Sequence, residues 1–316
     1  MMSILRERPN TCIAVVLAAV GVLAVQGRPV GADNAVLIGI QALIALSVGL
    51  SYGQAGILSM AQAVLAAVGG YLSAVLAMRL GISPYLALVP AVALPTVLAW
   101  GVARFVTPLD HLAAALATLA LSTVIEIVAR NWDSVTGGYI GLTGVPSLPG
   151  IRSAGAYAAV VWFAVCVAIY LYENLMRSAH GRALNTLRHD RARATADGVD
   201  APALMSAGFA MSAGFAGLAG WLYVHYITYM SPSSLDTHQS ISVLLMAVVG
   251  GVGYVLGPVI GTVLLSLLMH LLPAQEVQGL FFGGTLILIL LIARDGLLGY
   301  GNRSLKAWRA SKPGKP

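Results

Sequence analysis

Long stretches of this chain carry no charged side chain, and they constrain the fold more than any motif does. Runs without Asp, Glu, Lys or Arg cover residues 9–27, 34–78, 80–103, 111–125, 153–172, 201–235, 237–275 and 277–293. About 20 apolar residues in a helix span the hydrocarbon core of a membrane. Because runs 34–78 and 237–275 are each long enough for two crossings, the sequence predicts an all-α, polytopic integral membrane protein with eight to ten transmembrane helices.

Composition excludes a soluble protein. Hydrophobic residues make up 58% of the chain and charged residues only 9%, against about 25% charged residues in soluble domains. The longest stretches outside the apolar runs are 130–154, 173–200 and the tail after 295, which leaves no room for a soluble enzymatic domain. No phosphate-binding G-x-x-x-x-G-K-[ST] motif occurs. Any energy source for the protein therefore lies in another chain or in an ion gradient.

The positions of Lys and Arg predict the orientation, because basic residues concentrate in cytoplasmic loops. With ten crossings and a cytoplasmic N-terminus, only four of the 18 basic residues fall outside, namely Arg28, Arg79, Arg130 and Arg152. Both termini are then cytoplasmic, with a transmembrane domain over residues 1–300 and a basic cytoplasmic tail over 301–316. The segment from Arg6 to Asp33 also resembles a signal peptide, so cleavage is an alternative to a first crossing there.

Two turns carry no charge to mark them. They lie near Ser51–Gly56 and near Gly257, within the two longest uncharged runs. Each is either a turn between two crossings or a broken, re-entrant element, which a bilayer permits only where the backbone is shielded by protein or lines a cavity.

The loop over 177–200 is the most charged interior segment. Residues 182–196 contain no Gly or Pro, and Gly198 follows as a C-terminal cap, so the sequence predicts a short helix here. Leu184 and Leu187 lie on one side of it, with arginines around them. An amphipathic helix of this kind fits a groove on a cytosolic partner or, alternatively, an anionic membrane surface.

Small residues are frequent in the apolar segments, where they allow membrane helices to approach closely. The candidate packing residues are Gly214, Gly217, Gly220, Gly250, Gly251, Gly257 and Gly261. A Gly-rich block occurs in each half of the chain, as a pseudo-symmetric duplication would produce. Three polar residues in apolar surroundings, Ser59, Gln62 and Tyr71, are candidates for a transport pathway or for a polar contact between helices.

Several motifs together resemble branched-chain amino acid ABC importer permeases of the LivM type. They are S-A-H-G-R-A-L-N-T-L-R-H-D at 178–190, F-A-M-S-A-G-F-A-G-L-A-G at 209–220, the Gly-rich segments 56–71 and 248–262, and T-G-G at 136–138. The likeness covers roughly residues 35 to 300. Departures at Ile57, Ala61, Gln62, Ile140 and Asp295 leave the class intact but weaken any assignment of leucine or valine as the substrate.

The resemblance implies partners and roles. The charged loop would be the coupling loop that docks on ATP-hydrolysing subunits, with Arg182, Leu184, Leu187, Arg188 and Gly198 at the matching positions. The outer loop 130–154, with Thr136, Gly137 and Gly138, would contact a periplasmic solute-binding protein. A second, homologous permease subunit would complete a heterodimer in the bacterial inner membrane. No cofactor is implied.

Other ionisable residues suggest no catalytic or metal site. Glu126 lies at membrane depth, a default candidate for function, but Arg130 follows four residues later, and the spacing predicts a helical ion pair. His225, His270, Cys12 and Cys166 stand alone in apolar runs without ligand spacing. The sequence thus favours an importer permease, with an ion-coupled secondary transporter as the alternative and a membrane-embedded enzyme or scaffold as the third class.

Overall fold

The computed structural model describes residues 11, 29–270, 283–284 and 296–300. The expected first and last apolar segments and the basic tail therefore lie almost entirely outside the described residues. The elements are α3 (Pro29–Ser51), α4 (Gln62–Arg79), α5 (Pro84–Val106), α6 (His111–Asn131), α7 (Asp133–Thr136), β1 (Leu142–Thr143), α8 (Ala154–Arg177), α9 (Ala179–His189), α10 (Arg191–Ala196), α11 (Ala201–Ile227), β2 (Tyr229–Met230), α12 (Thr237–Gly250) and α13 (Gly257–His270).

Six helices within the described residues are long and apolar enough to cross a membrane: α3, α4, α5, α6, α8 and α11. α12 has 14 residues, or roughly 21 Å of helix, which is short of the ~30 Å hydrocarbon core. α13 has 14 residues within the described part of the chain, which stops at residue 270. The described part of the run 237–275 thus contains two helices separated by a turn at residues 251–256. The described structure is thus helical apart from two two-residue strands, and it has several candidate membrane spans. The two further segments that the sequence predicts lie outside the described residues.

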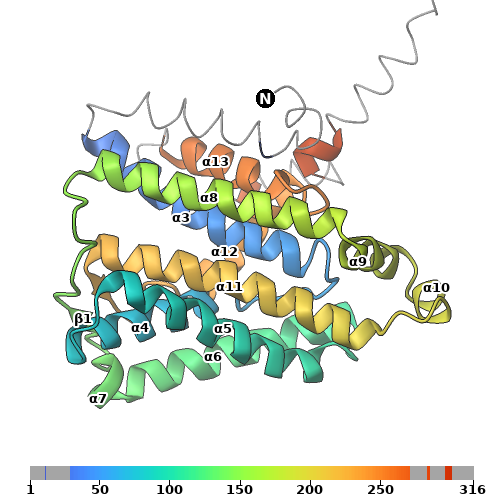
Figure 1. Cartoon of the computed structure of the whole chain (residues 1–316), viewed down its shortest axis with the longest axis horizontal. Coiled ribbons are helices and arrows are strands. Elements are labelled where there is room, and N and C mark those ends of the chain that lie inside the picture. The colour runs from blue at the N-terminus through green and yellow to red at the C-terminus, as the bar shows by residue number, and fades with distance from the viewer. Residues whose placement is uncertain (1–10, 12–28, 271–282, 285–295, 301–316) are drawn as a thin grey trace, which may run out of the picture.

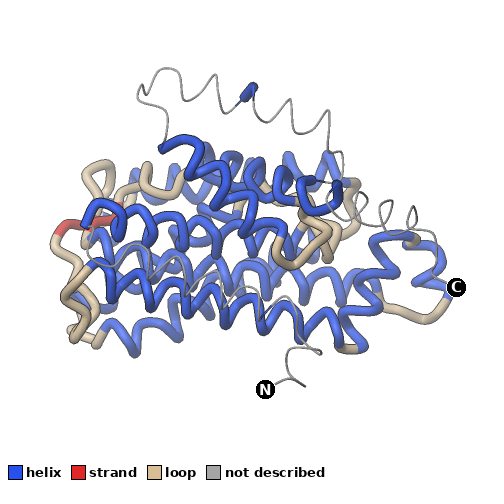
Figure 2. The backbone as a smooth tube through the Cα atoms, turned by 90° about the horizontal axis from the view of Figure 1, so that it is seen from above, coloured by secondary structure: helices blue, strands red, loops and turns tan. Residues whose placement is uncertain are grey.

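The long helices lie side by side along one direction, with short strands at one end (Figures 1 and 2). α11 packs against α3, α4 and α5, and α3 also packs against α8 and α13. β1 and β2 form an antiparallel pair, Leu142 with Met230 and Thr143 with Tyr229, which ties the loop before α8 to the end of α11. The loop carrying α9 and α10 lies at the opposite end of the bundle (Figure 1).

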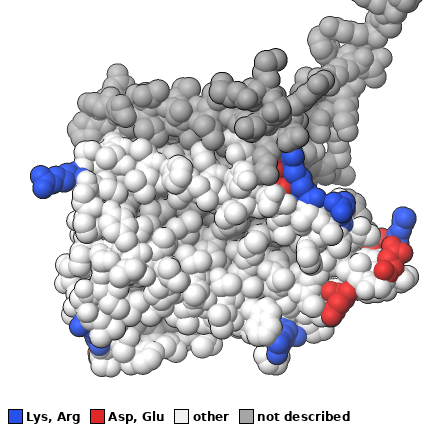
Figure 3. Space-filling model, in the orientation of Figure 1, with Lys and Arg blue, Asp and Glu red and all other residues white. Residues whose placement is uncertain are grey.

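Charge follows the same axis. On the face in Figure 3, charged side chains lie toward the two ends of the helices and the band between them carries none. Several helices begin with a side chain that accepts a backbone N–H, which satisfies donors that the first turn of a helix leaves unpaired. These residues are Ser83, Asp110, Ser153, Asp200 and Asp236. The helix boundaries therefore coincide with polar residues between the apolar runs.

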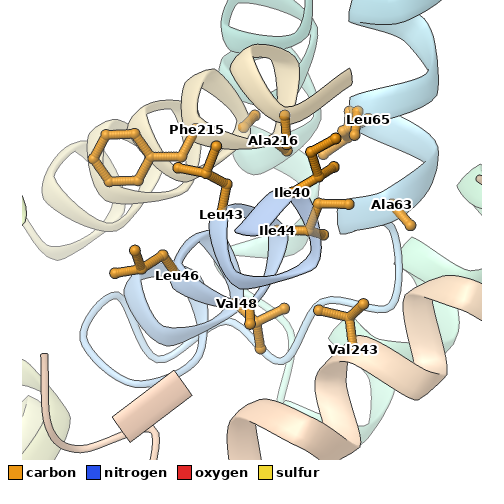
Figure 4. Close-up of a cluster of buried hydrophobic side chains, with 14 of the residues drawn as sticks. Ile40, Leu43, Ile44, Leu46, Val48, Ala63, Leu65, Phe215, Ala216 and Val243 are labelled. Carbon is orange, nitrogen blue, oxygen red and sulfur yellow. The ribbon is translucent and has the colours of Figure 1, made fainter. Parts of the chain in front are cut away.

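α3 is the centre of the core. Its residues Ile40, Leu43, Ile44, Leu46 and Val48 are buried among side chains of the neighbouring helices (Figure 4). The surrounding side chains labelled there are Ala63 and Leu65 of α4, Phe215 and Ala216 of α11, and Val243 of α12. In a bilayer such contacts act through close packing, because lipid tails are as apolar as the side chains.

Glycines bring α4, α5 and α11 together. A Cβ at Gly220 would lie 1.8 Å from the carbonyl oxygen of Ala66, and a Cβ at Gly217 would lie 2.5 Å from that of Ala91. Gly69 of α4 faces both Ala91 and Gly217. Larger side chains at these positions would force the backbones apart, so the three helices contact one another through their main chains.

The predicted packing glycines other than Gly217 and Gly220 occupy two other places. Gly250 and Gly261 meet where α12 and α13 lie closest, and a Cβ at Gly257 would lie 1.9 Å from the carbonyl oxygen of Gly251. Gly251 ends α12 at a φ of 106°, a conformation that glycine adopts without steric cost. Gly214 packs against Val92 and Thr96 of α5, and the three residues line a groove of about 570 Å³ between α5, α8 and α11.

Candidate functional site

Near the start of the charged loop, Gly181 lies against the backbone at the end of α8. Ser178 caps α9 by accepting the N–H of Gly181 at 3.2 Å. A Cβ at Gly181 would lie 2.2 Å from the carbonyl oxygen of Leu175 and 2.4 Å from the Cα of Met176. Only glycine lets α9 turn back against the end of α8 in this way. α9 consequently begins at Ala179, three residues before the start that the sequence predicted.

The loop contains two helices where one was predicted over 182–196. Asp190 has extended backbone at φ −152° and accepts the N–H of Arg193 at 2.9 Å, so it ends α9 and caps α10. The C-terminal cap expected at Gly198 is present at φ 82°, with Gly198 N–H bonded to Thr195 O and Val199 N–H bonded to Ala194 O. These two bonds form a Schellman motif.

The apolar side of α9 is not available to a partner. Leu184 is 1% exposed and Leu187 is 8% exposed. The two Cδ atoms of Leu184 lie 3.8 Å from the position of a Cβ on Gly208 of α11. The sequence interpretation that placed these leucines in a partner's groove is therefore corrected, because they hold α9 on the body of the protein itself.

The opposite side of α9 is exposed. Arg182 and Asn185 lie on it, His180 and Arg188 are also exposed, and one guanidinium nitrogen of Arg182 donates to Arg177 O at 2.9 Å. A hollow of about 470 Å³ opens between α9 and the start of α11. It is lined by Ala179, His180, Ala183, Val199, Asp200, Ala203, Leu204 and Ala207. This end of the bundle thus presents a polar helix beside a concave surface.

A second feature is the break between α3 and α4, which is buried among the helices. Residues 52–61 have no regular helix, yet most of them are buried. Gln62, at the start of α4, accepts from Ser47 Oγ at 3.0 Å and donates to Ser212 Oγ at 3.3 Å. Its side chain therefore links α3, α4 and α11, and Ser59 Oγ accepts the N–H of Ala61 at 3.2 Å.

Neighbouring helices satisfy the backbone of this break. Thr118 Oγ1 of α6 accepts the N–H of Met60, and Ser122 Oγ donates to the Met60 carbonyl, each at 3.0 Å. Ser240 Oγ of α12 accepts the N–H of Ala63 at 3.1 Å. Irregular backbone at membrane depth requires such partners. The sequence analysis did not single out Thr118, Ser122 or Ser240. Thr118 and Ser122 stand one helical turn apart, and this spacing is the signal that could have indicated a pair of hydroxyls on one side of α6.

Removing this pair of hydroxyls should destabilise the break. In Thr118→Val with Ser122→Ala, both polar groups of the Met60 peptide lose their partners, at about 1–3 kcal/mol for each buried group. We expect the melting temperature in detergent to fall by at least about 4 °C. Thr123→Val is the matched control, since Thr123 is exposed and its hydroxyl donates to Leu119 O of its own helix. Equal melting temperatures for the two variants would show that these hydroxyls do not hold the break.

Tyr71 does not join this network. It lies nine residues along α4 from Gln62, roughly 14 Å away along the helix, and is 9% exposed. Its hydroxyl has no hydrogen-bond partner among the described residues. The structure thus separates Tyr71 from Ser59 and Gln62, with which the sequence analysis grouped it.

The Gly-rich loop at the other end is held tightly by its own backbone. Thr136 Oγ1 donates to Ala129 O at 2.6 Å and accepts the N–H of Gly138 at 3.3 Å. Gly137 and Gly138 have φ values of 73° and 59°, and a Cβ at Gly138 would overlap the carboxylate of Asp133. The turn presents Tyr139 and Ile140 to the surface, each 76% exposed.

Glu126, Arg130 and His225 have structural partners. Arg130 pairs with Glu126 at 2.6 Å, so the predicted ion pair is confirmed, and Glu126 also accepts from Thr237 Oγ1 at 3.3 Å. His225 Nδ1 donates to Pro146 O at 2.6 Å, which leaves Nε2 to accept from Ser73 Oγ at 2.7 Å. Among the described residues, no three His, Cys, Asp or Glu side chains are grouped to hold a metal ion.

These features define a helical, multi-pass membrane protein with a charged pair of helices at one end and a rigid Gly-rich loop at the other. The chain belongs to the family described as the permease component of the branched-chain amino acid transport system, whose model matches residues 32–290. It is therefore a non-catalytic transmembrane subunit of a transport system. The resemblance stated from the sequence motifs is confirmed.

Two curated relatives carry the same description, "high-affinity branched-chain amino acid transport system permease protein LivM". The protein from Salmonella typhimurium is 25% identical over 225 residues, covering 62% of this chain and 52% of its own length. That from Escherichia coli is 25% identical over 234 residues, covering 65% and 55%. The chain thus spans about half the length of these relatives. No solved structure matches it.

Proposed function

We propose that this chain is the membrane permease of an ATP-driven ABC importer. It would move a small polar solute, a branched-chain or related amino acid, from a periplasmic binding protein to the cytoplasm by alternating access. The substrate class rests on the family and on the relatives' descriptions. The structural observation that supports the mechanism best is the exposed, basic side of α9 beside the hollow at the start of α11.

The proposed partners follow from this arrangement. An ATP-binding subunit would dock on α9 and insert part of its surface into the hollow, so Arg182 would face it while Leu184 and Leu187 hold α9 in place. The loop with Thr136, Gly137 and Gly138 would meet the binding protein through Tyr139 and Ile140. A second permease subunit would pair with this chain in the bacterial inner membrane, with both termini in the cytoplasm.

Blocking the hollow should remove the ATP-binding subunit. Arg182→Glu reverses a charge beside the hollow, and Ala203→Trp fills it from an exposed position on α11. We expect the double variant to retain less than a tenth of the wild-type amount of ATP-binding subunit on co-purification in mild detergent, measured by mass spectrometry. Tenfold is a loss of about 1.4 kcal/mol in binding.

Ala159→Trp provides the control, because Ala159 is exposed on α8 and does not line the hollow. Both variants should insert and melt like the wild type. Full retention of the ATP-binding subunit by the double variant would contradict the docking assignment. A chain that purifies alone and takes up leucine into liposomes under an ion gradient, without ATP, would establish the alternative of a secondary transporter.

A further inference from the structure

α9 and the irregular segment 52–61 both pack against one glycine of α11, Gly208. The two Cδ atoms of Leu184 in α9 lie 3.8 Å from the position of a Cβ on Gly208. The Cβ of Ala55, in the irregular segment 52–61, lies 3.0 Å from that same position. Gly208 is buried. Because Gly208 has no side chain, α9 and segment 52–61 pack onto one point of α11.

A second series of contacts joins the same two elements. The guanidinium nitrogens of Arg188 lie 3.3 Å from the Cβ position of Gly253, in the turn between α12 and α13. On the other side of that turn, a Cβ at Gly53 would lie 1.9 Å from the carbonyl oxygen of Val252. The turn therefore contacts α9 through Arg188 and segment 52–61 through Gly53.

Segment 52–61 is an irregular part of the core between two helices. It has no continuous helical hydrogen-bond ladder, and Gly56 has a φ of 72°. Hinges in proteins are a few residues at element ends that absorb changes in backbone dihedral angles. On one side the segment adjoins the end of α3, where Tyr172 donates to Gly49 O at 3.0 Å; on the other it leads into the Gln62 network. Displacing it would shift α3 and α4 relative to α6 and α12.

We propose that Gly208 and Ala55 are positioning residues that transmit the docking of the ATP-binding subunit to segment 52–61. A movement of α9 would reach Gly208 through Leu184. It would reach the α12–α13 turn through Arg188, which is the second contact. The inference rests on the proposed function, since it names how the docked subunit acts on the membrane domain. Purely static packing at Gly208 would instead leave the response to ATP unchanged.

The test exchanges one methyl group across the contact. Gly208→Ala crowds Ala55, Ala55→Gly opens the contact, and the double variant moves the methyl from one side to the other. The reporter is Leu58→Cys, half-buried in the segment, in a chain with Cys12 and Cys166 replaced by serine. Its labelling rate with N-ethylmaleimide is measured in the purified complex, with and without ATP and vanadate.

We expect at least a fivefold change in the labelling rate in the wild-type background. Each single variant should abolish this change, and the double variant should restore it. Gly101→Ala is the control, because nothing lies within 4 Å of a Cβ at that position of α5. If Gly208→Ala does not assemble, the same contact is tested by the other two variants. Ala55→Gly should lose the ATP-dependent change in labelling rate, and the double variant should regain it.

A second reporter separates this inference from the proposed function. His180 is exposed at the start of α9 and lines the hollow. In His180→Cys, a docked subunit should therefore protect the cysteine from labelling in every variant. Protection at 180 with the same ATP response at 58 in all variants would overturn the role of Gly208 and leave docking in place. An unprotected cysteine at 180 in the wild-type background would overturn the docking itself.

Discussion

Replacing Gly220 by leucine is expected to prevent α4 and α11 from packing. The nearest atom to a Cβ at this position is a backbone carbonyl oxygen, that of Ala66 at 1.8 Å, which cannot rotate away as a side chain could. One of the two helices must therefore move bodily. We expect a loss of at least about 3 kcal/mol, the upper part of the range for overpacked cores, with little folded protein recovered by size-exclusion chromatography in detergent.

The control for this substitution is Gly101→Leu in α5, where a Cβ has no atom within 4 Å. It tests whether an added leucine in a membrane helix is harmful by itself. The control should elute and melt like the wild type. If Gly220→Leu does so as well, the close approach of α4 and α11 is not required for the fold.

Placing a carboxylate at Leu184 is expected to release α9 from the body of the protein. Leu184 is 1% exposed and packs on Gly208, so an aspartate at this position would carry a buried carboxylate. Truncating a buried leucine costs about 2–5 kcal/mol, and burying an unpaired charge costs more. We expect Leu184→Asp to insert in the membrane, to lose the ATP-binding subunit, and to be cut by added protease within residues 179–198.

Asn185→Asp is the matched control, one residue further along the exposed side of α9. It introduces the same charge at an exposed position, where the carboxylate stays in contact with water. Its protease resistance should therefore match the wild type. Resistance of Leu184→Asp at the same level would show that the apolar side of α9 does not anchor the loop.

The contrast between these two neighbours shows what could be predicted about the loop. Composition and spacing predicted a helix with leucines on one side and arginines around them, and the helix exists. The partner of the leucines could not be predicted, because an apolar side shows that a helix is covered but not by what. The covering surface is α11, and the break at Asp190 depends on a side-chain cap that competes locally with a continuous helix.

The membrane core shows a similar division. Ser59 and Gln62 were recognisable as polar residues in apolar surroundings, whereas Thr118, Ser122 and Ser240 were not. Serine and threonine in a membrane helix can bond to their own helix, as Thr118 also does to Ala114 O at 3.0 Å. Met60 and Thr118 are 58 residues apart and Ala63 and Ser240 are 177 apart. Only the packed bundle brings such pairs within hydrogen-bond distance.

The sequence by itself determined the class of protein. Uncharged runs of spanning length indicate a protein of the bilayer, and the resemblance of the loop and glycine-rich motifs to known permeases indicated the family. The tertiary structure decided which residues face one another, including the burial of Leu184 and the packing of α9 and segment 52–61 on Gly208. The physical reason is that hydropathy is a property of each residue, whereas close packing and hydrogen bonds between helices belong to pairs that are distant in the chain.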